Sequence, residues 1–213
     1  MLRMRVVALV FVLLVLCAAC TGDADKALIE AAKKGDAALV REQLDGGADV
    51  NAHDETGLTA LMATKTGDTT VVQMLLDAGA DVHADRYSAT TLMEIVAKGD
   101  TTVVQMLLDA GADVHAKDRD NRTALVYAAD KGFKDVVRML LDAGADVHVS
   151  ATSGWTPLVY AAYGGDTTLV RMLLDAGADV RVRARNRRTV LMIAAERGNS
   201  DVVRMLKEAG AEE

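Results

Sequence analysis

A seven-residue phrase recurs along the chain and limits the folds that it can adopt. The phrase reads LDGGADV at residues 44–50, LDAGADV at 76–82, 108–114, 141–147 and 174–180, and KEAGAEE at 207–213. Its central glycine returns every 32 or 33 residues, as Gly47, Gly79, Gly111, Gly144, Gly177 and Gly210. This period is typical of stacked helical arrays, in which each unit buries its apolar face against its neighbours. The phrase therefore predicts an all-α solenoid of six units, and such arrays usually present a long surface to a partner.

Each unit has the pattern of two short helices followed by a polar connection. Around residues 116–143, the segment TALVYAADKG precedes FKDVVRMLLDAG. Val136, Val137, Leu140 and Leu141 have the spacing of one buried helix face, and Gly144 fits a left-handed C-cap. The polar stretch KDRDNR favours a hairpin-like turn. We therefore predict six stacked helix-turn-helix repeats, at approximately 25–50, 51–82, 83–114, 115–147, 148–180 and 181–213.

These repeats resemble the ankyrin-repeat family, whose unit reads roughly D-x-x-G-x-T-P-L-H-x-A-A-x-x-G before its second helix and G-A-D-V-N after it. The threonine column of that pattern is present as Thr59, Thr90, Thr123, Thr156 and Thr189. The family proline survives only as Pro157, and the family histidine is replaced by Met62, Met93, Val126, Val159 and Met192. The resemblance covers residues 24–213 and implies that hairpin tips and exposed first-helix faces bind a partner protein.

Two units are one residue shorter than the others. Thr59 to Gly67 spans 8 residues where the other units have 9, and Gly79 to Thr90 spans 11 where they have 12. The first deletion predicts a shorter first helix in repeat 2, and the second predicts a shorter hairpin at the entry to repeat 3. Polar residues at 42–43 and 207 replace apolar residues of the interior repeats, which predicts that the first and last repeats are caps.

The N-terminus has the pattern of an export signal. Arg3 and Arg5 precede an apolar run from Val6 to Leu16, and the sequence CAAC follows at 17–20. The run is shorter than the roughly 20 residues that span a bilayer, although an uncleaved anchor helix is an alternative. The end of the signal resembles a bacterial lipobox. This implies a signal peptide over 1–19, lipidation of Cys20, a tether over 20–24 and one ankyrin-repeat domain over 25–213.

The same resemblance implies a location in the bacterial cell envelope, facing the periplasm, and Thr21 after the lipidated cysteine favours the outer membrane. A soluble periplasmic or secreted protein, cleaved after Ala19, is the alternative. Both cysteines lie in the signal segment, so the repeats contain no disulfide. The formal charge of −7 argues against nucleic acid as a partner.

Four aromatic residues gather in repeats 4 and 5 of a chain with only 3% aromatic residues. Tyr127 and Tyr160 share one column, Tyr163 follows one helical turn later, and Trp155 lies in the preceding hairpin. Because Tyr and Trp are common at interface hot spots, these residues are candidates for partner binding. Packing between helices is the structural alternative.

Five arginines lie within eight residues, at Arg181, Arg183, Arg185, Arg187 and Arg188. The alternate spacing of the first four would orient them to one side of an extended hairpin arm. Guanidinium groups suit carboxylates or phosphates, so the cluster predicts an acidic partner surface, with anionic lipid or glycan as another possible ligand. A solvated hairpin whose arginines balance nearby carboxylates is the structural alternative.

The remaining patterns do not point to catalysis or to a cofactor. His83, His115 and His148 occupy one column, where stacking would separate them by about 8–10 Å, too far to share a metal with bonds near 2 Å. A hydrogen-bonding role in the hairpin is expected for them. The methionines at 74, 106, 139, 172 and 205 are expected to fill the core. No phosphate loop, nucleophile elbow or zinc helix occurs.

We therefore expect a monomeric, non-enzymatic module that binds an unidentified protein. The narrower hypothesis is inhibition of a partner, for example by an immunity protein that masks a toxic enzyme. An envelope scaffold or a stress-protection protein is the alternative.

Overall fold

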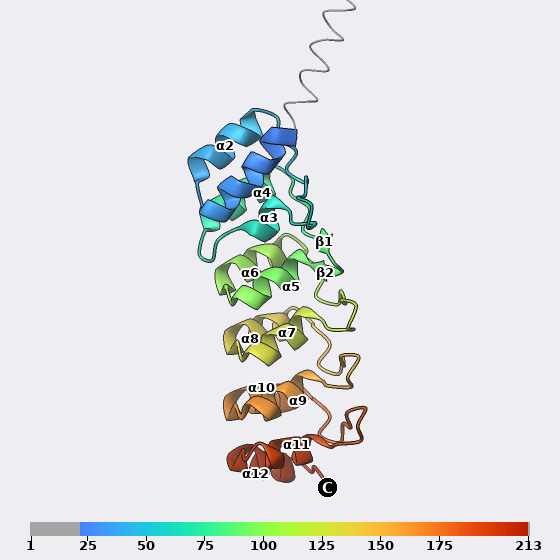
Figure 1. Ribbon diagram of the computed structural model, residues 1–213. Helices are drawn as coiled ribbons and strands as arrows, with labels where there is room; N and C mark the ends of the chain where they lie inside the picture. Colours follow the sequence, from blue (N-terminus) through green and yellow to red (C-terminus); the bar gives the residue numbers. More distant parts are fainter. Residues whose placement is uncertain (1–21, 213) are drawn as a thin grey trace, which may run out of the picture. The chain divides into compact units, whose positions relative to one another are not determined.

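Residues 22–212 are described in a computed structural model of the protein, drawn in Figure 1. They belong to two compact units that divide between Ala84 and Asp85, called unit 1 and unit 2 below. No helix within 22–212 is long and apolar enough to cross a membrane. The predicted signal peptide and lipidation site, residues 1–20, lie outside the described residues, so both stay predictions.

Unit 1 contains two helix pairs. Residues 22–34 are helical, and α2 (Ala37–Asp45), α3 (Ala60–Ala63) and α4 (Thr69–Asp77) follow. The helix α3 has only four residues, which confirms the prediction of a shorter first helix in repeat 2. The helix ends because Thr64 leaves the helical conformation, with φ −53° and ψ 145°. The hydroxyl of this buried residue donates a hydrogen bond to the Leu61 carbonyl at 2.9 Å.

Unit 2 contains four helix pairs. It begins with β1 (Asp85–Arg86) and β2 (Ala89–Thr90), and its helices are α5 (Thr91–Lys98), α6 (Thr101–Asp109), α7 (Ala124–Lys131), α8 (Lys134–Asp142), α9 (Pro157–Gly164), α10 (Thr167–Asp175), α11 (Val190–Glu196) and α12 (Ser200–Glu208). The first helices α5, α7, α9 and α11 pack in succession, and so do the second helices. The hairpins of this unit extend from the same side of the helices (Figure 1). The predicted all-α helical-repeat fold is confirmed.

The core of unit 2 consists of apolar columns that recur from one repeat to the next. In α8, Val136, Val137 and Leu140 are buried as predicted, whereas Leu141 is only half-buried. The methionine column borders this core, because Met205 is buried and the other four methionines are half-buried. Aspartates begin several second helices and accept hydrogen bonds from first-turn backbone N–H groups, as Asp100 does for Val103 at 3.1 Å.

The hairpin between β1 and β2 is shorter than the others. Asp85 pairs with Thr90 and Arg86 with Ala89, which leaves a two-residue turn of Tyr87 and Ser88. Their φ angles are 52° and 73°, as a type I′ turn requires. In the hairpin of the next repeat, the Asp118 N–H donates instead to the carbonyl of Arg122, around a three-residue loop. The prediction of a shorter hairpin at the entry to repeat 3 is therefore confirmed.

Gly99 and Gly132 both end a first helix, and replacing each by alanine tests how tightly the next repeat packs against that end. Both have φ 73°, but a Cβ at Gly99 would lie 2.9 Å from the Phe133 ring, whereas one at Gly132 would meet nothing within 4 Å. Alanine at either position costs about 1–2 kcal/mol for the left-handed conformation. We expect Gly99→Ala to lose about 1–3 kcal/mol more, because the ring is crowded. Urea unfolding of the two variants checks this, and equal losses would contradict it.

Candidate functional site

Three of the four predicted aromatic residues come together on repeat 5. The Trp155 ring lies 5.0 Å from that of Tyr160, at 65°, and 5.2 Å from that of Tyr163, at 55°, measured between centroids. Tyr163 exposes 41% of its surface, and the other two residues are half-buried. The Arg197 guanidinium lies 4.3 Å over the Tyr163 ring and helps to hold it. We call Trp155, Tyr160 and Tyr163 the aromatic cluster.

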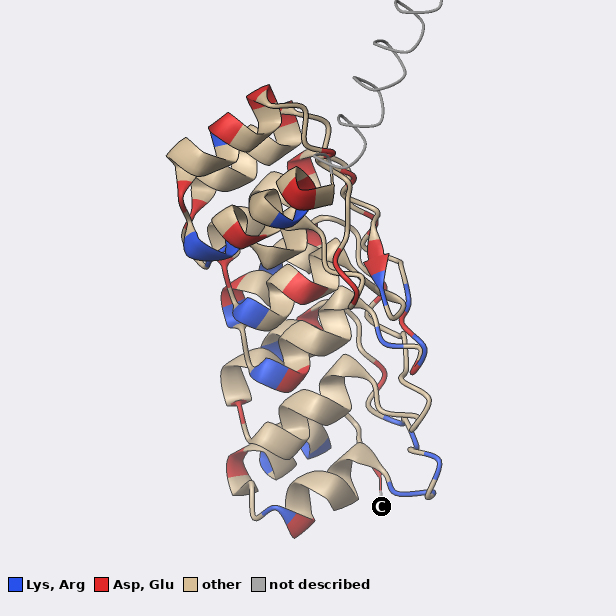
Figure 2. Ribbon diagram, turned by 45° about the horizontal axis from the view of Figure 1, so that its top comes forward, with Lys and Arg blue, Asp and Glu red and all other residues tan. Residues whose placement is uncertain are grey.

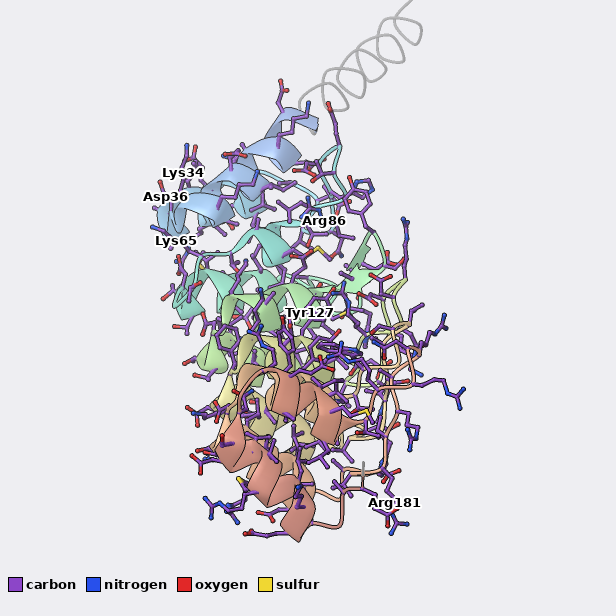
Figure 3. The ribbon with its side chains drawn as sticks, turned by 60° about the horizontal axis from the view of Figure 1, so that its bottom comes forward. Lys34, Asp36, Lys65, Arg86, Tyr127 and Arg181 are labelled. Atoms are coloured by element: carbon purple, nitrogen blue, oxygen red, sulfur yellow. The ribbon has the colours of Figure 1, made fainter. Side chains whose placement is uncertain are left out.

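Tyr127 shares a column with Tyr160 but uses its hydroxyl within the protein. The hydroxyl donates a hydrogen bond to Asp118 Oδ2 at 2.8 Å, and the Arg122 guanidinium lies 4.5 Å over the ring. Burial and the hydrogen bond to Asp118 raise the pKa of Tyr127 to about 12. The Tyr127 hydroxyl is therefore engaged inside the protein, as the alternative of a packing role would have it. Its ring is half-buried. Figure 3 labels this residue.

Asp118 is the centre of that network, and sequence reasoning missed it. Its side chain is only 7% exposed, and burial alone would raise its pKa. Hydrogen bonds from the Arg122 backbone, the Tyr127 hydroxyl and the Arg122 guanidinium instead keep the pKa below 3.8. The sequence KDRDNR contains two aspartates, and nothing in it indicates that Asp118 turns inward while Asp120 stays exposed.

The five arginines at 181–188, here called the arginine hairpin, differ in their partners. Arg188 forms an ion pair with Glu196, the last residue of α11. Arg183 Nη1 donates to the Arg187 carbonyl at 3.3 Å. Arg181, Arg185 and Arg187 are exposed, and no ion pair within 22–212 includes them. Figure 3 shows Arg181 on the hairpin side of unit 2.

The prediction that four arginines point to one side of an extended arm is wrong. Arg183 forms an antiparallel bridge with Thr189, but the chain turns after Ala184. The Arg187 N–H donates to the Ala184 carbonyl at 2.8 Å, and Arg187 has φ 64°. The reversal is needed to bring the chain back to α11. It places Arg185 and Arg187 in the turn itself.

Successive hairpins of unit 2 are bonded to one another. The Thr152 N–H donates to the Asp120 carbonyl at 2.6 Å, and the Arg185 N–H donates to the Ser153 carbonyl at 3.0 Å. The Asn121 side chain adds a hydrogen bond to the Ser150 carbonyl at 2.6 Å. Hydrogen bonds between loop backbones fix the tips relative to each other. The tips therefore form a continuous, ordered surface beside the first helices.

The hairpins also carry a charge opposite to that of the whole chain. Residues 115–122 and 181–188 contain eight lysines and arginines and two aspartates, whereas the chain has a formal charge of −7. Figure 2 shows basic residues along these loops. In the histidine column, the backbone N–H of His83, His115 and His148 donates to an aspartate two residues earlier at 2.8–2.9 Å. No group of three or more possible metal ligands occurs among the described residues.

Helix pairs of 32 or 33 residues, joined by hairpins that bond to each other, define a class of repeat proteins. A family model described as "Ankyrin repeats (3 copies)" matches residues 28–118 and 125–213. The chain belongs to the ankyrin-repeat family. It is also similar to the crystal structure of an ankyrin repeat domain from Acinetobacter baumannii AYE, with 34% identity and a TM-score of 0.78, over 87% of this chain and 98% of that one.

A comparison with curated proteins found no match. Membership of the family is nevertheless informative, because ankyrin repeats indicate a protein–protein interaction module. The fold is typically non-enzymatic.

The pKa of Tyr127 gives a testable pH dependence. Because its folded value of about 12 lies above 10.0, the hydroxyl contributes fully to stability below pH 10.0 and loses this contribution as the pH rises towards 12. We expect Tyr127→Phe to be about 1 kcal/mol less stable than the parent at pH 7, as for one lost hydrogen bond. Urea unfolding at pH 7 and pH 11 measures the difference, which should shrink or reverse at the higher pH. A constant difference would contradict the assignment.

Proposed function

We propose that the protein is a lipid-anchored ankyrin-repeat module of the bacterial cell envelope, which binds a partner protein through the hairpin tips and first-helix faces of repeats 3–6. The observation that carries this proposal is the aromatic cluster beside hairpins that are bonded to one another. Large rings on a scaffold of fixed shape suit recognition of a folded surface. Binding needs no chemistry at this site.

The aromatic cluster has the properties of an interface anchor. Tyr163 exposes 41% of its surface, while contacts with Trp155 and Arg197 restrict its ring. A side chain that is held before binding loses less conformational entropy when the partner arrives. Tyr and Trp are also the residues on which interface energy concentrates. We therefore place the centre of the binding surface at repeat 5.

The N-terminal sequence supports the envelope location. A lipid on Cys20 would lie two residues before the helix over 22–34, and two residues reach about 7 Å at full extension. The repeats would then stay close to the membrane on its periplasmic side. Thr21 after the lipidated cysteine favours the outer membrane.

The narrower role that we favour is inhibition of the partner, as an immunity protein masks a toxic enzyme, because a fixed surface without chemistry can cover an active site. An envelope scaffold or a stress-protection role would use the same surface. One observation favours a different class of ligand. Arg181, Arg185 and Arg187 are exposed, and anionic lipid or glycan could bind there, with a steep dependence on salt.

Lipidation is tested with two cysteine variants. Cells grown with labelled palmitate should incorporate label into the parent chain and into Cys17→Ser, but not into Cys20→Ser. The last variant should also leave the membrane fraction, because a lipid chain contributes about 0.8 kcal/mol per buried methylene to membrane binding. Label retained in Cys20→Ser would contradict the anchor. Absence of label from both the parent chain and Cys17→Ser would favour simple secretion.

Partner binding is tested by capture from an envelope extract. We expect Tyr163→Ala to hold a captured protein at least about tenfold more weakly than the parent, as for loss of a hot-spot aromatic. Arg171→Ala is the control, because Arg171 is exposed in the same repeat but lies on the second helix α10, outside the hairpin tips and first helices. Circular dichroism confirms that both variants are folded. Equal capture by Tyr163→Ala and the parent would contradict the proposed surface.

A further inference from the structure

We infer that the partner presents an acidic, extended segment to Arg181, Arg185 and Arg187, with a large apolar side chain of the same segment against the aromatic cluster. This inference rests on the proposed function, since it names the chemistry of the protein that the surface binds. It depends on four features of unit 2: the partners of the arginines, the turn that contains Arg185 and Arg187, the approach of that turn to the residue before Trp155, and the distribution of charge.

The arginine hairpin keeps three guanidinium groups available for an external anion. Arg188 is occupied by Glu196, and Arg183 is bonded to the turn backbone. Arg181, Arg185 and Arg187 are exposed and belong to no ion pair between residues 22 and 212. A guanidinium group binds a carboxylate with two parallel hydrogen bonds, which gives both affinity and orientation.

The backbone at Arg187 is unusual for an arginine. Its φ is 64°, and the corresponding residues of the two preceding turns are Asn121, with φ 60°, and Gly154, with φ 81°. Asparagine and glycine tolerate this conformation, whereas a long side chain is strained in it. Such strain is typical of functional positions. An arginine at the turn is therefore better explained by binding than by folding.

The arginine turn adjoins the aromatic cluster. Gly154, the residue before Trp155, approaches the next hairpin so closely that a Cβ on it would lie 2.9 Å from Arg185 N. The hydrogen bond from Arg185 N to the Ser153 carbonyl, at 3.0 Å, fixes this approach. One short segment of a partner can thus reach both features. An extended segment that crosses the two bonded hairpins would contact the arginine turn and the aromatic cluster together.

The charge distribution favours a protein segment over an anionic membrane. Within unit 2 the basic residues concentrate on the hairpins (Figure 2), whereas the chain as a whole carries −7. A negative chain is repelled from an anionic bilayer at distances within the Debye length, while a single acidic strand contacts only the basic hairpins. The rings of the cluster also pack against each other, with centroids 5.0 and 5.2 Å apart, rather than projecting singly as an inserting side chain would.

The test uses immobilised synthetic peptides in three series, probed with the full-length chain in mild detergent. One series alternates Glu with small residues and contains one Phe; the second replaces each Glu by Gln; the third replaces the Phe by Ala. The variant Arg181→Gln/Arg185→Gln/Arg187→Gln removes the three available cations. Its matched control, Arg138→Gln/Arg171→Gln/Arg204→Gln, removes three arginines from the exposed faces of α8, α10 and α12.

We expect the parent to prefer the Glu–Phe series, and the hairpin variant to bind it roughly tenfold or more weakly, as for loss of three exposed guanidinium–carboxylate contacts. The helix control should bind like the parent. Equal weakening of both variants, or no preference for Glu over Gln, would overturn the inference. With Cys20→Ser, which lacks the lipid, and without detergent, binding to phosphatidylglycerol vesicles but neither to phosphatidylcholine vesicles nor to the peptides would overturn it as well. A concentration-dependent dimer that the hairpin variant abolishes would do the same.

The failure of this inference is distinguishable from failure of the proposed function. If the hairpin variant captures the envelope partner as well as the parent does, while Tyr163→Ala does not, the protein binds a partner without an acidic segment. If neither the parent nor any variant captures a protein, the proposed function itself is wrong.

Discussion

The packing of successive helix pairs against each other within a unit is the interaction on which the rest of this structure depends. One repeat is too small to enclose its own apolar side chains, so a neighbour must cover them. A single column shows the effect. Val126 is 1% exposed and Val159 is fully buried, but Met192, which occupies the same column in α11, is 37% exposed. Burial in this protein is therefore a property of the stack and not of the individual unit.

Stacking also creates the proposed binding surface, because it brings residues 33 positions apart into register. The hairpins of repeats 4–6 are bonded to each other through backbone groups. Tyr160 and Tyr163 lie on α9, Trp155 lies in the hairpin before it, and Arg197 follows α11. The two halves of this surface differ in chemistry, with rings on the helix side and cations on the hairpin side. Because hydrogen bonds and ring contacts hold both halves, the proposed surface would select a partner by shape and charge together.

The helices and the irregular positions could be predicted because they depend on local rules. Apolar residues at helical spacing, a glycine after each second helix and a turn-prone connection recur in every repeat. Counting residues between fixed columns also located the four-residue α3 and the turn at Tyr87 and Ser88. A deletion in a repeat has few places to be absorbed, since the flanking columns must stay in register with their neighbours.

The sequence by itself determined the repeat, the helix pairs and the residue types available for binding. The tertiary structure alone decided what each of those residues does. Tyr127 and Tyr160 occupy one column, yet the Tyr127 hydroxyl is bonded to Asp118, while Tyr160 packs on Trp155. The arginines alternate in the sequence, yet the chain turns among them, and only three have neither an ion pair nor a side-chain hydrogen bond to the described residues. The reason is that a side chain's role depends on how each hairpin folds back towards its own first helix, and the residue types in the sequence do not indicate which side chain turns inward there.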